Sequence, residues 1–200
     1  MRHWKAWLLL ALAVWAGWSW WGGRPVARAA GVIAPDDPVQ VDFGSPQSPI
    51  ALEHATLHPL ARFSLTARVL SREDYRFDAE SALSPTDLAL GWGRMSDSSV
   101  LHDIDVGQSG RFYHWQVKSF PIPRREIESH SANMHMVPAN AQVAHALKRV
   151  RAGDVVTLAG LLVEADKPSG WRWRSSMART DTGAGACELV YVQDLRIEPR

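Results

Sequence analysis

An alternation of apolar and polar side chains over residues 61–69 is the feature that most constrains the fold of this chain. Within ARFSLTARV, every second position is apolar, and the intervening positions are arginine or small and polar. Successive side chains of a β-strand point to opposite faces, so this period predicts a strand buried on one face only. Residues 61–200 are therefore expected to form a domain built around a sheet.

Four further segments carry strand patterns: 110–117, 153–165, 170–176 and 186–197. One helix is predicted to begin after Asn140, a good N-cap residue, and to stop at Gly153. Gly160, inside an apolar run, indicates a bulge or a bend in a barrel. These elements predict a β-rich α+β domain, expected to be a small barrel of the OB or SH3-like type, although a sandwich fits the pattern too. Cys187 is the only cysteine, so the domain must be stabilised by its hydrophobic core and not by an internal disulfide.

Residues 1–23 are predicted to be a transmembrane helix, a signal-anchor that stays uncleaved. The uncharged run 6–23 reaches the length of about 17–25 residues that spans a bilayer core, and its tryptophans suit a membrane interface. A cleaved signal peptide ending at Ala27-Arg28-Ala29 is the alternative. The basic N-terminus favours a single-pass topology in a bacterial inner membrane, with the N-terminus cytoplasmic and the C-terminal domain periplasmic. The bilayer is then the first partner, through residues 6–23.

Residues 24–60 are rich in Pro, Gly, Ala and Ser and are predicted to be a linker between the anchor and the domain. The first 30 residues hold four basic side chains and no acidic one, so the remaining chain carries 18 basic and 21 acidic side chains. Nucleic-acid binding by bulk electrostatics normally needs a marked basic excess. No nucleic-acid partner is therefore expected.

The segment HSANMH, residues 130–135, offers three interpretations. In the first, Cys187 is a nucleophile, His130 or His135 is its base, and Asn133 orients the base. In the second, the histidines bind a metal, but no further ligand stands at a diagnostic spacing, so neither a metal nor another cofactor is assigned. In the third, the polar residues of HSANMH bond the local backbone and Cys187 is a small buried hydrophobe.

A second set of candidate ligand-binding residues combines basic and aromatic side chains: Arg124, Arg125, Trp171 and Trp173. Arginine and tryptophan together suit stacking on a ring or holding an anion, as on barrel folds that bind oligonucleotides or sugars. The alternative is a strand with its tryptophans packed and its arginines in water. The acidic balance of the domain favours this alternative.

Four stretches carry a family resemblance: SREDYRFD (71–78), LALGWGRMSD (88–97), HSANMH with Pro138, and DTGAGACELVYV (181–192). With them the chain resembles an uncharacterised family of short bacterial membrane-anchored proteins. The resemblance implies a bacterial origin and a membrane location, and it implies no activity. Two hypotheses follow. One is a periplasmic interaction or accessory domain with an envelope protein as partner. The other is a small hydrolase or metal-dependent enzyme that uses HSANMH with Cys187 and Glu188.

Overall fold

The computed structural model describes residues 7, 9–10, 24–178 and 185–199. Most of the anchor expected over residues 1–23 lies outside these residues. Among the residues that are described, no helix is both long and apolar enough to cross a bilayer.

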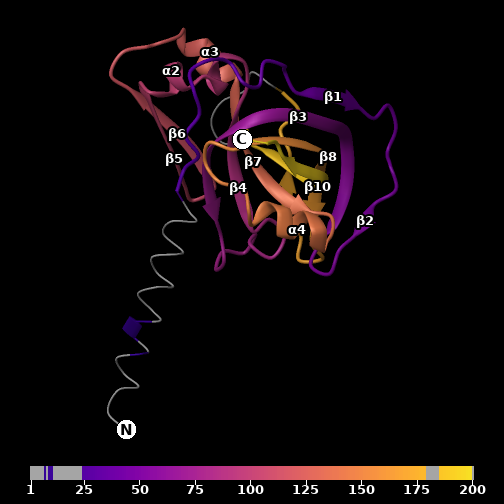
Figure 1. Ribbon diagram of the computed structural model, residues 1–200. Helices are drawn as coiled ribbons and strands as arrows, with labels where there is room; N and C mark the ends of the chain where they lie inside the picture. The colour runs from indigo at the N-terminus through magenta and orange to yellow at the C-terminus, as the bar shows by residue number, and fades with distance from the viewer. Residues whose placement is uncertain (1–6, 8, 11–23, 179–184, 200) are drawn as a thin grey trace.

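Five strands enclose the main core. They are β3 (Thr56–Asp74), β4 (Thr86–Gly91), β7 (Ser131–Pro138), β8 (Val155–Asp166) and β10 (Glu188–Ile197). They pair in the order β3–β4–β7–β10–β8, and β8 pairs in turn with β3; only the β7–β10 pair is parallel. Figure 1 shows β3 curving around the other strands. The expected β-rich α+β class is confirmed.

Strand β3 contains the predicted alternation and continues beyond it on both sides, to a length of 19 residues. Phe63 and Leu65 point into the core, where they meet Leu88, Met134 and other apolar side chains. The register shifts between Pro59 and Ala61 and again between Val69 and Ser71. Extra residues of this kind bend a strand, which allows β3 to pair with β8 along its first part and with β4 along its last.

The sequence predicted a bulge or bend at Gly160, and the structure has an irregularity in β10, the strand that faces this residue. Gly160 pairs with Val192, and the register of β10 against β8 shifts between Val192 and Asp194. A Cβ on Gly160 would stand only 2.1 Å from the carbonyl oxygen of Tyr191. The close approach of the two backbones therefore requires glycine at this position.

The stretch expected to be a linker lies along the domain instead of hanging away from it. Strands β1 (Val39–Asp42) and β2 (Ile50–Ala51) pair with β3. Before them, the Val26 amide donates to Ala152 O, and the amides of residues 33–34 donate to Ser96 Oγ. Few of these residues favour a regular element, yet their backbone groups still pair with acceptors that the domain presents.

The long connection between β4 and β7 carries a separate layer. It contains η1 (Gly93–Ser96), α2 (Ser98–Leu101), β5 (Ile104–Ser109), β6 (Phe112–Val117) and α3 (Arg124–Ser129). Strands β5 and β6 form a hairpin closed by Gly110 and Arg111, both with positive φ, as a two-residue hairpin turn requires. The predicted helix is α4 (Ala141–Leu147), capped by Asn140 as expected. The prediction of a single helix was wrong, because α2 and α3 are too short to show a helical period.

Candidate functional site

Residues 131–135 of HSANMH belong to strand β7, and His130 lies at the end of α3. Ala132 and Met134 point into the core on one face of β7, while Ser131, Asn133 and His135 lie on its outer face. Successive side chains therefore alternate between the core and a polar surface.

The β5–β6 hairpin covers this outer face of β7. The hydroxyls of Tyr113 and Ser131 are 2.7 Å apart, and Gln108 Nε2 donates to Asn133 Oδ1 at 2.6 Å. The Asn133 amide in turn donates to Arg111 O at the hairpin tip. Burial raises the pKa of Tyr113 to about 12. Ser131 Oγ also donates to the local backbone, to Ile127 O at 2.6 Å, as the third interpretation expected. The bonds of Asn133 reach across to the hairpin instead.

A charged network holds the hairpin tip on β4 and on the segment that precedes it. The Arg111 guanidinium forms a two-point pair with Asp78 at 2.8 and 2.9 Å, and its third nitrogen donates to Asp87 Oδ1 at 2.8 Å. It also stacks 3.7 Å from the Tyr75 ring centre. Asp87 is fully buried, and its other oxygen lies 2.8 Å from His135 Nδ1, out of line for a hydrogen bond. Hydrogen bonds from Arg111 hold the pKa of Asp78 below its usual range.

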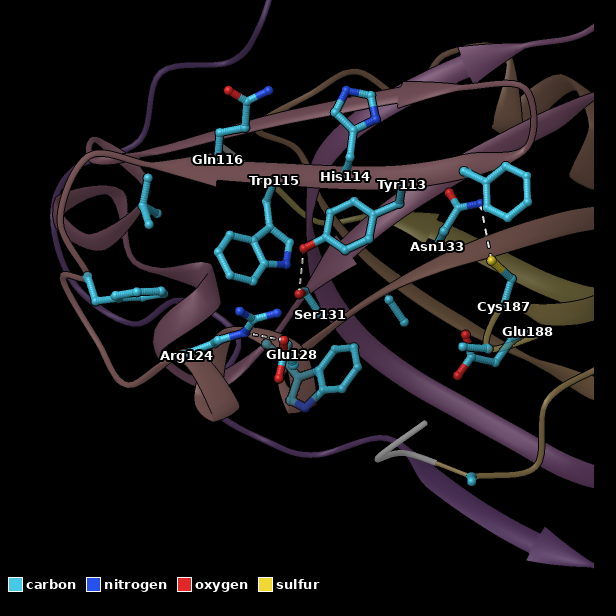
Figure 2. Close-up of a pocket in the computed structure, with 17 residues that line it drawn as sticks. Tyr113, His114, Trp115, Gln116, Arg124, Glu128, Ser131, Asn133, Cys187 and Glu188 are labelled. Carbon is cyan, nitrogen blue, oxygen red and sulfur yellow. Dashed lines mark hydrogen bonds and ion pairs between the residues drawn. The ribbon is translucent and has the colours of Figure 1, made fainter. Parts of the chain in front are cut away.

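Cavity 1, of about 620 Å³, lies between this hairpin, α3 and β7. Figure 2 shows Tyr113 and Trp115 facing Ser131, with the Arg124–Glu128 ion pair to one side and the Asn133–Cys187 contact to the other. Its lining includes a set of aromatic residues: Trp92, Phe112, Tyr113, Trp115 and Phe120. Cavity 1 therefore combines aromatic walls with polar groups.

Cavity 2, of about 380 Å³, lies on the other side of Cys187. Its lining includes Arg111, His135, Trp173 and Cys187. The Trp173 ring packs on the His135 ring with 4.5 Å between centres. Cys187 thus belongs to the lining of both cavities.

The four candidate catalytic residues do not all meet. Asn133 Nδ2 lies 3.8 Å from Cys187 Sγ, and His135 shares cavity 2 with Cys187. His130 caps the end of α3 and lies against Trp92, and it lines neither cavity. Cys187 is half-buried, which is more open than the structural interpretation expected.

The candidate ligand-binding residues fall in separate places. Arg124 lines cavity 1, pairs with Glu128 and lies over the Trp115 ring. Arg125 is exposed on the same helix. Trp171 and Trp173 line cavity 2, where their rings meet edge to face.

Sequence reasoning missed two central residues, Asp87 and Arg111. Asp87 is an acid at the start of the apolar run LALG, a position where burial demands a partner. Arg111 falls inside the strand expected at 110–117, but in the structure it occupies the hairpin turn, and the local pattern does not reveal what its side chain reaches. Within the described parts of the chain, no group of three His, Cys, Asp or Glu side chains could hold a metal ion.

Comparisons with known proteins leave the chain without a family assignment. No family model, curated protein or solved structure shows a significant match to this sequence.

Proposed function

We propose that this chain is an interaction domain held at a bacterial inner membrane by residues 6–23 and exposed to the periplasm, where it binds an envelope protein through cavity 1. The uncharged, tryptophan-rich run after a basic start supports the anchor and its orientation. So does the resemblance to membrane-anchored bacterial proteins. The observation that carries binding is the aromatic-walled cavity between the hairpin and β7.

We further infer that the five paired strands form a partly open Greek-key barrel of the OB type, in which β4 and β7 are the second and third strands. Such barrels bind ligands on the face of these two strands and on the loops that flank it. Both cavities border the outer face of β7, and Cys187 joins them from the segment between β8 and β10. The position of the cavities thus agrees with where this fold binds.

A protein is the occupant that the surface of cavity 1 suits. Phe112 and Phe120 line it and are 54% and 53% exposed, although rings of this size are usually buried. Aromatic residues and arginine are enriched where proteins bind one another, and Arg124 lies beside these rings. The excess of acidic residues after residue 30 disfavours a nucleic acid.

The partner is expected at the membrane surface. Val26 is hydrogen-bonded to the domain, only three residues beyond the expected span. Three extended residues reach about 10 Å. The domain therefore stays close to the bilayer, instead of being lifted from it by a long tether as the composition of residues 24–60 suggested.

Photo-crosslinking in living cells tests this proposal. We expect benzoylphenylalanine in place of Phe120, at the cavity, to capture one envelope protein. The same residue in place of Phe77 is a matched control, since Phe77 is also an exposed phenylalanine, at 99%, and does not line cavity 1.

A second substitution checks that the capture depends on the cavity. We expect Phe112→Ser to lower the adduct yield from position 120 about tenfold, because an aromatic hot spot contributes roughly 1.4 kcal/mol or more. Equal adducts from positions 77 and 120, or a yield unchanged by Phe112→Ser, would reject cavity 1 as the binding site.

A further inference from the structure

We infer that Cys187, His135 and Asp87 form a thiol–imidazole site in cavity 2 that accepts an acyl group from a carboxylic ester. This activity goes beyond the proposed binding function. It differs from the interpretation of HSANMH in which Cys187 is a nucleophile oriented by Asn133. His130 has no part in the site, and the buried Asp87 replaces Asn133 as the partner of the histidine.

Three adjacent strands bring these residues to one face. Asp87 of β4 stands directly opposite His135 of β7. Glu188 of β10 pairs with Met134, so Cys187, the residue before it, comes beside Asn133, within 3.8 Å of its amide. The nucleophile and the base are thus on neighbouring strands and line the same cavity.

The environment of His135 points to a ligand. Its side chain is only 3% exposed, and Nδ1 faces Asp87 at 2.8 Å. Its other nitrogen, Nε2, makes no hydrogen bond to any residue that the structure describes, and it is not among the buried unpaired atoms, so it borders open space in cavity 2. The charged groups nearest the ring are Asp87 from β4 and, through Asp87, Arg111 from the hairpin. Glu80, Arg172 and Arg174 line the same cavity. The Asp87 carboxylate lies close enough to the ring to orient it.

Cys187 has the exposure that a reactive thiol needs. It is half-buried and lines both cavities, whereas a purely structural thiol is enclosed by apolar side chains. The rings of Trp171 and Trp173 wall cavity 2 beside it. The two indole rings therefore offer an apolar wall to the acyl group of an ester, in a cavity that charged side chains also line.

The reaction follows from these positions. His135 Nε2 takes the proton of the thiol, and the Cys187 sulfur attacks the carbonyl carbon, forming a C–S bond. The C–O bond to the leaving group breaks, and His135 returns the proton to that oxygen, which leaves as an alcohol. Water then hydrolyses the thioester to a carboxylic acid and restores the thiol. Asp87 acts as a positioning residue.

Alkylation of the chain by iodoacetamide tests the thiol, because Cys187 is its only cysteine. At pH 7 only a few per cent of an ordinary cysteine is thiolate. We expect alkylation at least fivefold faster in the folded chain than in the same chain unfolded in guanidinium chloride. Folded protein that reacts no faster than unfolded protein overturns the inference.

Variants assign the roles. His135→Gln should remove the rate advantage, and His130→Gln, a change of the same kind outside both cavities, should keep it. Asp87→Asn should move the midpoint of the alkylation pH profile upward, which a purely structural loss would not do. A rate advantage that survives His135→Gln in folded protein contradicts the assignment of the base.

The acyl step is tested with 4-nitrophenyl butyrate. We expect a burst of nitrophenol and an acyl adduct on Cys187 by mass spectrometry, both absent in Cys187→Ser. Wild-type protein that forms no adduct overturns the step. His135→Gln, which changes cavity 2 and not cavity 1, should still crosslink from position 120, so the failure of this site and the failure of the binding proposal are distinguishable.

Discussion

Replacing Gly160 with alanine is expected to lower the free energy of unfolding by about 3 kcal/mol, the upper part of the range for overpacked sites. The added Cβ would stand 2.1 Å from Tyr191 O, and its three nearest neighbours are all backbone atoms of β10. A flexible side chain would move aside at little cost, but here β8 and β10 must separate. For a domain of this size the melting temperature should fall by about 6–12 °C.

Thermal and urea unfolding followed by circular dichroism measure this loss. Gly44→Ala is the matched control, because a Cβ at Gly44 would meet no atom within 4 Å and the residue has no positive φ. This control should change stability by less than about 0.5 kcal/mol. A Gly160→Ala variant as stable as Gly44→Ala would refute the close approach of β8 and β10.

Replacing Arg111 with methionine is expected to cost about 3–5 kcal/mol, the usual penalty for removing one partner of a buried ion pair. The change leaves Asp87, which is fully buried, facing only His135, and it releases Asp78 and the hairpin tip. The hairpin walls cavity 1, so crosslinking from position 120 should fall as well.

Two comparisons isolate the buried charge. Arg196→Met removes an ion pair whose partners are 74% and 51% exposed, and it should cost less than about 1 kcal/mol. The double variant Arg111→Met/Asp87→Asn should recover part of the loss, because no unpaired buried carboxylate remains. Urea unfolding that gives the same stability for Arg111→Met and Arg196→Met would contradict the proposed network.

The same network predicts a loss of stability in acid. Because Arg111 holds the pKa of Asp78 below the unfolded value of about 3.9, the Asp78 contribution is present above that pH. It is lost as the pH falls through the lower folded value. Arg111→Met should therefore show a weaker dependence of stability on pH below about 4.

The sequence predicted the elements that local pattern controls. The alternation at 61–69 marked β3, Asn140 marked the start of α4, and Gly160 marked an irregularity that lies in the facing strand β10. HSANMH was harder to interpret. Residues 131–136 alternate polar and apolar side chains, which is a strand signal, but their polar face is buried under the hairpin and its residues were interpreted as a polar cluster.

The candidate site depended on pairings between distant segments, and for this reason it was predicted only in part. Asn133, His135 and Cys187 do lie near one another, but the partner of His135 is Asp87, some 48 positions earlier in the chain. Nothing in the local pattern around Arg111 indicates that its side chain reaches Asp78 and Asp87. Such contacts follow from strand order, which the sequence pattern left open.

The central claim, a domain anchored in the inner membrane and facing the periplasm, is tested most directly by thiol labelling of spheroplasts with a membrane-impermeant maleimide. In a Cys187→Ser background, Ser45→Cys offers an exposed reporter on the domain, and Arg2→Cys reports on the N-terminus. The proposal predicts that position 45 is labelled in intact spheroplasts and that position 2 is labelled only after lysis. Labelling of position 45 only after lysis, or loss of the protein from the membrane fraction, would contradict it.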